Sequence, residues 1–259
     1  MKHIAIIVKG PDPDINKCAK DISDYLMHFD GIEVTVMGIP NHPINPDCVI
    51  TIGGDGTLLH TVAQLEHQVP IIGINKGTVG FLADVDFNDA SVRLIESLID
   101  GSCDCISRMR IDAYVNDHLI GTALNDLAFA RNTRHFIEPS IVIDGVTALK
   151  FRGDGLIIAT PTGSTAYSMS AGGPIVDPRI DGYIVTPIAP YLLSARPQII
   201  APSRDVLVKV SGDWELQIDG EYCDNEEWDT IRIKKSLEPA LFIDCGRNFF
   251  EKVNTKLRR

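Results

Sequence analysis

The feature that most limits how this chain can fold is a β-branched run that leads into a glycine-rich loop. Residues 49–52 (Val, Ile, Thr, Ile) precede Gly53-Gly54-Asp55-Gly56-Thr57 and then an apolar stretch. This order predicts a buried strand, a loop and the start of a helix. The residues around Asp55 form a candidate phosphate loop, because glycines and a helix start expose backbone N–H groups: Gly53, Gly54, Gly56 and Thr57.

The carboxylate of Asp55 does not suit a simple phosphate loop. A negative charge at its centre repels phosphate, so we expect Asp55 to hold a metal ion, to accept a proton, or both. The alternative is a tight turn without a ligand, since Gly and Asp both favour turns on local grounds.

Strand and helix patterns alternate through about the first hundred residues. Predicted strands cover residues 4–8, 32–37, 49–52 and 70–74, and predicted helices cover residues 15–29, 57–66 and 88–98. The alternation favours a parallel sheet flanked by helices, that is, an α/β, Rossmann-like domain over residues 1–102. Ligands of such sheets bind beyond the carboxyl ends of strands, where the glycine-rich loop is expected.

From about residue 103 the pattern changes to short strands separated by turns. Expected strands cover residues 106–115, 119–131, 140–143, 148–151, 206–210, 214–218, 230–234 and 241–244, with Asn116-Asp117-His118 as a candidate hairpin turn. Such a series predicts a mainly antiparallel β-domain, which we assign to residues 103–240. Residues 247–257 carry apolar side chains at helical spacing, so a helix is expected within the tail, residues 241–259.

Composition excludes several kinds of partner. The chain has 259 residues and a formal net charge of -11, which argues against nucleic acid and anionic membrane surfaces. The apolar run near the start is too short for a signal peptide, and no stretch is long enough to cross a bilayer, so we expect a cytoplasmic protein. The six cysteines are scattered and are expected to be free thiols.

A second group of candidate residues lies within residues 156–174. Residues 156–160 predict a strand, and residues 161–168 (Pro-Thr-Gly-Ser-Thr-Ala-Tyr-Ser) predict a turn and a short helix that Ser164 or Thr165 caps. Small side chains let a ligand approach, and Tyr167 offers a flat ring and a hydroxyl to a base or a nicotinamide ring. A nucleoside pocket is the favoured interpretation, and close packing is the alternative.

Asn125 and Asp126 are adjacent polar residues inside an apolar strand pattern, and both need partners. One possibility is a strand end held by backbone hydrogen bonds. The other is a pair of contacts to a ribose or an amide of a ligand.

Taken together, these motifs resemble the NAD kinase family. The matching residues are Gly53-Gly54-Asp55-Gly56-Thr57, Asn125-Asp126, Asp154-Gly155, residues 160–168, Gly172-Gly173-Pro174-Ile175, residues 186–190, residues 193–197 and Asp219-Gly220. The glycine-rich loop is shared with diacylglycerol, sphingosine and phosphofructo-kinases, whereas the stretch from Thr160 to Tyr167 is much more specific. The resemblance covers nearly the whole chain.

The resemblance implies transfer of the terminal phosphoryl group of ATP, or of polyphosphate, to the adenosine ribose 2′-hydroxyl of NAD, which makes NADP. It implies an N-terminal α/β domain, a C-terminal β-sandwich domain, and a tail that returns to the first domain. It also implies Mg²⁺ as the divalent metal, an active site between the domains, and homodimers or homotetramers.

The resemblance also assigns roles to individual residues. Asp55 would be the catalytic carboxylate and would contact the substrate together with Gly56. The remaining cofactor-binding positions are Asn125 and Asp126, then Thr165, Ala166, Tyr167, Ser168, Met169 and Ser170, and Arg152, Asp154 and Ala189, which relatives often contribute from a neighbouring subunit. Glu221 and His135 are included as weaker candidates, and Lys76 is either a phosphate contact or a solvated lysine.

The sequence departs from the family pattern at two of these positions. Asp126 stands where the family usually has Glu, and Glu221 stands where it often has Gln. Two other functions compete with NAD phosphorylation. A lipid or sugar kinase would share the glycine-rich loop but leave residues 160–167 unexplained, and a non-catalytic NAD-binding protein would leave Asp55 without a role.

Overall fold

The computed structural model describes residues 1–75, 80–83, 85–86, 89–192, 194–223 and 228–257. Lys76, predicted above as a phosphate contact or a solvated lysine, lies outside these residues. The chain divides into two compact units, and each is described by itself. Unit 1 comprises Met1–Ser107 together with Ala240–Arg259, and unit 2 comprises Arg108–Pro239.

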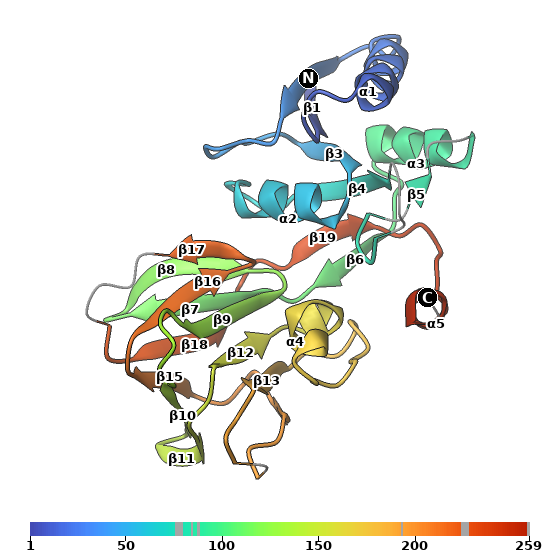
Figure 1. The fold of residues 1–259 in the computed structure, drawn as a ribbon. Helices are drawn as coiled ribbons and strands as arrows, with labels where there is room; N and C mark the ends of the chain where they lie inside the picture. The colour runs from blue at the N-terminus through green and yellow to red at the C-terminus, as the bar shows by residue number, and fades with distance from the viewer. Residues whose placement is uncertain (76–79, 84, 87–88, 193, 224–227, 258–259) are drawn as a thin grey trace. The chain divides into compact units, whose positions relative to one another are not determined.

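Unit 1 contains a seven-stranded sheet with the strand order β2-β1-β3-β4-β19-β6, and β5 pairs with β4 (Figure 1). The pairs β1–β2, β1–β3, β3–β4, β4–β5 and β4–β19 are all parallel. The strands are β1 (Lys2–Val8), β2 (Ile32–Gly38), β3 (Cys48–Gly53), β4 (Pro70–Asn75), β5 (Val85–Asp86), β6 (Cys105–Arg108) and β19 (Ala240–Ile243). The helices are α1 (Pro13–Leu26), α2 (Asp55–Ala63), α3 (Asp89–Asp100) and α5 (Phe249–Leu257).

Burial explains why β3 sits inside this sheet. Every residue of β3 is buried, as expected for a parallel strand that is covered on both faces. Helix α1 packs Ile15, Ile22 and Leu26 into the same core. The helix starts where the sequence predicts, because the Asp12 carboxylate accepts hydrogen bonds from the N–H groups of Asp14 and Ile15.

Unit 2 contains two antiparallel six-stranded sheets, with the orders β11-β10-β15-β18-β7-β8 and β14-β13-β12-β9-β16-β17. The strands of the first sheet are β7 (Ile111–Val115), β8 (His118–Ala123), β10 (Glu138–Ile143), β11 (Val146–Lys150), β15 (Val206–Ser211) and β18 (Ile231–Lys235). Those of the second are β9 (Asp126–Arg131), β12 (Gly155–Ala159), β13 (Tyr183–Ile188), β14 (Gln198–Ile200), β16 (Trp214–Ile218) and β17 (Glu221–Cys223). A 3₁₀ helix (Thr162–Thr165) and helix α4 (Tyr167–Ser170) follow β12.

Side chains of both sheets form one core, which makes unit 2 a β-sandwich. Ile111, Ile141 and Val208 of the first sheet belong to the same buried cluster as Phe129 and Leu156 of the second. Burying each such side chain stabilises the fold by about 1.5–3 kcal/mol. The predicted fold class, an α/β part followed by an antiparallel β-sandwich, is therefore confirmed.

Three predicted strands were wrong in their extent or their partners. The strand expected over residues 106–115 divides into β6 and β7, which belong to different sheets. The break lies at Arg110, whose Nε atom donates to the carbonyl of Glu238 while its own carbonyl accepts from the N–H of Ser236. The strand expected over residues 241–244 was placed among the antiparallel strands, but β19 runs parallel to β4 in unit 1.

The strand expected over residues 119–131 also divides, into β8 and β9, which lie in different sheets of the sandwich. Asn125 lies outside both strands, and Asp126 is the first residue of β9. The hairpin turn predicted before β8 is confirmed, with positive φ angles at Asn116 (48°) and Asp117 (63°).

Candidate active site

Asp55 is the first residue of α2, directly after the carboxyl end of β3 and the two glycines. Gly54 precedes the helix in an extended conformation and makes no side-chain cap. Gly53 has no room for a side chain, because a Cβ atom there would lie 2.5 Å from Oγ1 of Thr57. That Thr57 hydroxyl is buried and has no hydrogen-bond partner among the described residues. The loop therefore presents a carboxylate and a spare hydroxyl at a strand end.

The carboxylate of Asp55 accepts hydrogen bonds from three consecutive backbone N–H groups. Phe81 donates to Oδ2 at 2.7 Å, and Leu82 and Ala83 donate to Oδ1 at 3.0 and 2.9 Å. Gly80 is also required here, since a Cβ atom at that position would collide with Oδ1. We call this arrangement the Asp55 cradle. It fixes the position of the carboxylate without using a second side chain.

A matching arrangement occurs in unit 2 around Asp219. Leu124 donates its N–H to Oδ2 of Asp219 at 2.7 Å, and Asn125 and Asp126 donate to Oδ1 at 2.7 and 3.0 Å. We call this the Asp219 cradle. Asp219 and Gly220 form the two-residue turn between β16 and β17, with φ angles of 50° and 87°, which is typical of a type I′ turn. The turn thus aims the carboxylate at the break between β8 and β9.

The Asp219 cradle explains how the chain interrupts its strand at Asn125. Its N–H groups bond to a carboxylate, so they are unavailable to a neighbouring strand. The backbone of this pair is thus held at a strand end, and contacts of its side chains to a ligand stay a prediction. From the sequence, Asp219-Gly220 was recognised only as a family match, and its bonds to residues 124–126 were not predicted, although an Asp-Gly pair between two strands is typical of a hairpin turn.

Two carboxyl groups lie close together at this point. Burial raises the pKa of Asp126 to about 7, and the negative charge of Asp219 adds to the effect. Burial also raises the pKa of Asp219, whereas its three N–H donors and the charge of Arg110 act in the opposite direction. Burial, followed by the charges of Asp126 and Asp154, raises the pKa of the Tyr167 hydroxyl.

The hydroxyl-rich segment after β12 packs directly on Asn125. Thr160 donates its hydroxyl to the carbonyl of Leu124 at 2.6 Å and its N–H to the carbonyl of Asn125 at 2.8 Å. The same hydroxyl accepts from the N–H of Gly163 at 3.0 Å. A Cβ atom on Gly163 would lie 2.5 Å from the carbonyl carbon of Asn125, so only glycine fits. The structure therefore brings two of the predicted motifs together.

The predicted cap of the short helix was wrong. The residue before α4 is Ala166, and no side chain caps the helix. Ser164 instead accepts from the N–H of Val176 at 3.1 Å, and Thr165 donates to the carbonyl of Thr162 at 3.4 Å. These hydroxyls form hydrogen bonds within the loop and do not cap the helix.

The remaining candidates of this segment differ in exposure. Ser168 is buried and bonds to the hydroxyl of Thr186 at 2.8 Å. Tyr167 and Ser170 are exposed, whereas Ala166 and Met169 are half-buried. Oγ1 of Thr162 is buried with no hydrogen-bond partner in the described part of the chain. An exposed aromatic ring and small neighbours are thus available to a ligand, and an unpartnered hydroxyl is buried beside them.

Other predicted site residues lie around the ends of β12 and β13. Asp154 pairs with Arg131 at 3.0 Å and donates its N–H to the carbonyl of Ile188. Ala189, the next residue, has a positive φ angle of 42°. Arg152 pairs with Glu138 at 3.4 Å, and both side chains are largely exposed.

The two weaker candidates take no part in either cradle. His135 is exposed, and its N–H lies 3.4 Å from the hydroxyl of Thr133. Glu221 is exposed at the start of β17, two residues after Asp219. Among the described residues, no group of three His, Cys, Asp or Glu side chains is arranged to hold a metal ion. No helix in the described ranges is long and apolar enough to cross a membrane.

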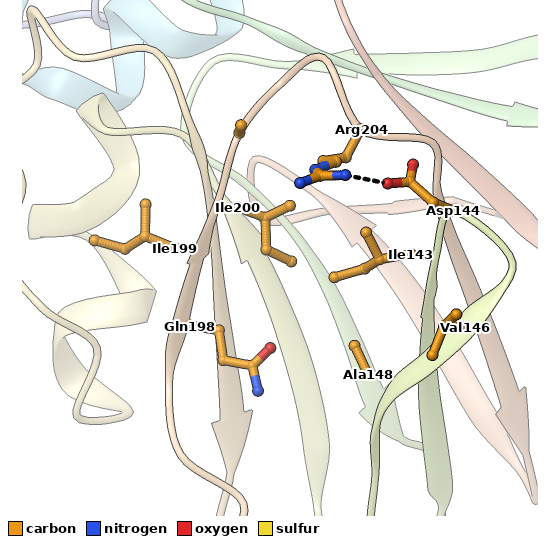
Figure 2. Close-up of a pocket in the computed structure, with 9 residues that line it drawn as sticks. Ile143, Asp144, Val146, Ala148, Gln198, Ile199, Ile200 and Arg204 are labelled. Carbon is orange, nitrogen blue, oxygen red and sulfur yellow. Dashed lines mark hydrogen bonds and ion pairs between the residues drawn. The ribbon is translucent and has the colours of Figure 1, made fainter.

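A hollow of about 650 Å³ lies elsewhere in unit 2, and Figure 2 shows its walls. Its apolar lining comes from β10, β11 and β14, and an ion pair between Arg204 and Asp144 at 2.6 Å closes one side. None of the predicted site residues lines it: the lining residues are Ile143, Asp144, Val146, Ala148, Gln198, Ile199, Ile200, Ala201 and Arg204.

Comparison with known proteins identifies the family. Residues 33–102 match the family model of the ATP-NAD kinase N-terminal domain, and residues 124–245 match that of the ATP-NAD kinase C-terminal domain. The chain belongs to the NAD kinase family. The residues of each cradle fall within one matched range. Asp55 and residues 81–83 lie in the range of the N-terminal model, and Asp219 and residues 124–126 lie in that of the C-terminal model.

Relatives of known name cover almost the entire chain. The NAD kinase of Methanospirillum hungatei is 44% identical over 99% of this chain and 99% of its own length. That of Methanothermobacter thermautotrophicus is 36% identical over 99% of this chain and 96% of its own length. The predicted family membership is thereby confirmed.

Two solved structures share the fold. The NAD kinase from Archaeoglobus fulgidus in complex with ATP has a TM-score of 0.82 and 30% identity, and 98% of each chain is covered. Yeast NADH kinase complexed with NADH has a TM-score of 0.87 and 28% identity, covering 100% of this chain and 87% of the other. As a member of the NAD kinase family, the chain is a phosphotransferase that phosphorylates NAD to NADP with ATP.

Proposed function

We propose that Asp55 is the general base of this NAD phosphorylation. The observation that carries the proposal is the Asp55 cradle, which holds one carboxylate rigidly at the carboxyl end of a buried parallel strand. Phosphoryl transfer depends mainly on positioning and on charge stabilisation. A fixed carboxylate next to a glycine-rich loop supplies the first of these requirements.

The proposed reaction forms one bond to phosphorus and breaks another. The 2′-hydroxyl oxygen of the adenosine ribose forms a bond to the γ-phosphorus of ATP, while the bond from that phosphorus to the bridging oxygen breaks and ADP leaves. The hydroxyl proton passes to a carboxylate oxygen of Asp55. Because the hydroxyl becomes acidic only as the new bond forms, the proton moves late, and a positioned base contributes about 10²–10⁴-fold.

The dinucleotide is assigned to residues of unit 2. Asn125 and Asp126 would bind hydroxyl or amide groups of NAD, and the exposed ring of Tyr167 would stack on a base or on nicotinamide. Thr165, Ala166, Ser168, Met169 and Ser170 would form the wall around it. The support for this assignment is the packing of residues 160–163 on Asn125 and the buried, unpartnered hydroxyl of Thr162.

Arg152, Asp154 and Ala189 are assigned to an NAD site shared with a second copy of the chain, in a homodimer or homotetramer. Arg152 has the fork geometry that suits a phosphate oxygen pair. Its ion pair with Glu138 is largely exposed, so a ligand phosphate can replace it at little cost. Glu221 and His135 remain candidates for peripheral contacts.

Mg²⁺ is the proposed divalent metal, and ATP or polyphosphate is the donor. Mg²⁺ keeps several waters and is usually held by one or two carboxylates plus substrate phosphates. In the described part of the chain, Asp55 is a carboxylate beside the loop expected to bind the donor phosphates, so it is the residue that would take part in holding such an ion. When bound, the ion would neutralise charge on the phosphates, and Thr57 and the N–H groups after Gly53 would bind the donor phosphates. We place the enzyme in the cytoplasm.

The test of the proposed base is the Asp55→Asn variant. We expect NAD binding within a few-fold of wild type and NADP formation lowered by about 10²–10⁴-fold, because the amide cannot take the proton. NADP formed from NAD, ATP and Mg²⁺ is measured with an NADP-specific dehydrogenase, and NAD binding by calorimetry. Asp100→Asn is the matched control, since Asp100 also accepts a backbone N–H but lies at the end of α3.

Near-normal turnover of Asp55→Asn would show that Asp55 is not the general base. Repeating the wild-type assay with polyphosphate in place of ATP decides the range of donors. Repeating it with a chelator tests the metal, and turnover that persists without any divalent ion would contradict the proposed Mg²⁺ dependence.

A further inference from the structure

The Phe81 segment, which supplies the Asp55 cradle, is held from a second side by the C-terminal helix α5. Nζ of Lys252 donates to the carbonyl oxygen of Phe81 at 3.4 Å. Nζ of Lys256 lies 4.0 Å from the centroid of the Phe81 ring, and the ring of Phe249 lies 6.4 Å from it. Residues that are more than 160 positions apart in the sequence thus meet within unit 1.

One peptide group connects Lys252 to Asp55. The carbonyl of Phe81 and the N–H of Leu82 belong to the same peptide, and that N–H donates to Oδ1 of Asp55 at 3.0 Å. Hydrogen bonds in such a chain polarise and strengthen one another. An ammonium at the carbonyl therefore strengthens the donor that fixes the carboxylate.

The surroundings of Lys252 fit this connection. The side chain is half-buried, and burial lowers the pKa of its ammonium. The charge of Asp55 favours the ammonium form, whereas the charge of Lys256 on the same helix opposes it. Partial burial of a lysine costs free energy unless the charge interacts with partners. A peptide carbonyl and a nearby carboxylate are such partners.

We propose that Lys252 is a positioning residue for the reaction, which holds the Asp55 carboxylate through the Phe81–Leu82 peptide. The proposal rests on the proposed role of Asp55 as the base. The proposal gives α5 a function beyond packing. The helix has no fully buried residue, and half-buried side chains make its contacts to Phe81.

Three variants separate this function from simple packing. Lys252→Met keeps most of the aliphatic stem and removes the ammonium, and Lys252→Arg restores a cation that can reach the carbonyl. Lys256→Met is the matched control. It also removes one positive charge from α5, but the ammonium of Lys256 contacts the ring of Phe81 and not its carbonyl oxygen.

The measurements are kcat and KM for NADP formation, and amide hydrogen exchange at Leu82. For Lys252→Met we expect kcat to fall about tenfold and the exchange rate at Leu82 to rise about tenfold, the effect of one charge-assisted hydrogen bond, with KM for NAD within about twofold. Lys252→Arg should recover most of both values, and Lys256→Met should stay within about threefold of wild type. The N–H groups of residues 124–126 provide an internal control for global unfolding, because Asp219 holds them independently.

Wild-type kcat and Leu82 exchange in Lys252→Met would overturn the proposal, as would equal losses in Lys256→Met. Asp55→Asn is measured in parallel, so that a failure of the role proposed for Lys252 can be told from a failure of the role proposed for Asp55. If Asp55→Asn loses turnover and Lys252→Met does not, only the role of Lys252 fails. If Asp55→Asn keeps its turnover, the proposed base fails, whatever Lys252 does.

Discussion

The two cradles use the same geometry in different settings. Asp55 and Asp219 each accept hydrogen bonds from three consecutive N–H groups of a distant segment. Asp55 starts a helix at the end of a parallel strand, whereas Asp219 occupies a hairpin turn with a positive φ angle. The comparison teaches that a carboxylate surrounded by N–H donors is not by itself a catalytic group.

The neighbours of each carboxylate make the difference. Asp55 lies beside three glycines and the unpartnered hydroxyl of Thr57, so a ligand can approach it closely. Asp219 lies beside Asp126 and near the charge of Arg110, and the segment that it holds is packed under Thr160 and Gly163. We therefore expect the first cradle to serve chemistry and the second to serve the shape of the NAD site.

The largest expected effect on stability comes from Asp219→Ala. The substitution leaves three N–H groups without their acceptor at a crowded strand break, and we expect the free energy of unfolding to fall by about 2–4 kcal/mol. Urea unfolding measures this change. Asp100→Ala, which removes an acceptor at an exposed helix end, should change it far less. Equal effects would show that the Asp219 cradle is not a structural element.

Glycine substitutions next to each cradle give an intermediate effect. In Gly163→Ala the new methyl group meets the backbone of Asn125, so the chain itself must shift. We expect this variant to lose about 1–3 kcal/mol of stability. In Gly80→Ala the methyl group meets chiefly the Asp55 side chain, which can rotate away, and it lies 3.0 Å from the carbonyl oxygen of Ala83.

Gly80→Ala should therefore lower NADP formation more than it lowers stability, and Gly163→Ala should show the reverse. Turnover per folded molecule and urea unfolding are measured on both proteins. Parallel losses of both quantities in the two variants would contradict the separation of the cradles into a catalytic and a structural one.

A pH dependence of stability is also expected, and it arises at Asp126. Its pKa in the folded protein is about 7, above the ordinary carboxyl value. The folded state thus retains a proton that the unfolded chain has lost, so the stabilising contribution is full below about pH 4 and disappears as pH rises through about 7. In the Asp126→Asn variant the side chain cannot ionise, so this loss of stability with rising pH is absent.

Between about pH 5 and about pH 8, the free energy of unfolding of wild type should fall by about 2–3 kcal/mol relative to that of Asp126→Asn. Urea unfolding at the two pH values measures the difference. Asp219, whose pKa is also raised, remains in both proteins, so the difference reports the proton of Asp126 together with its electrostatic interaction with Asp219. Parallel pH profiles would show that Asp126 does not carry this proton.

The fold was predictable to the extent that it depends on local patterns. Hydrophobic runs and alternation with helices located β1, β3 and β4, and helical spacing over residues 15–29 located α1 to within about three residues at each end. The breaks at Arg110 and at Asn125 were not predictable in the same way. They depend on hydrogen bonds to residues about 95 to 130 positions away, at Asp219 and Glu238, which no local pattern contains.

The candidate site was predictable as a set of motifs but not as a set of contacts. The sequence identified Asp55, Asn125 and Asp126 through their unusual residue neighbours. It could not identify residues 81–83 as partners of Asp55, or Lys252 as a partner of Phe81, because backbone N–H and carbonyl groups are the same in every sequence. The turn at Asp219-Gly220 is the exception, since an Asp-Gly pair between two expected strands could have predicted a hairpin, although none was predicted there.

The different roles of the two cradles are tested most directly by comparing Asp55→Asn with Asp219→Asn in a single assay of NADP formation at saturating substrates, per folded molecule. We expect Asp55→Asn to lose about 10²-fold or more and Asp219→Asn to stay within about tenfold of wild type. Equal losses, or a greater loss for Asp219→Asn, would contradict the claim that the two cradles hold one catalytic and one structural carboxylate.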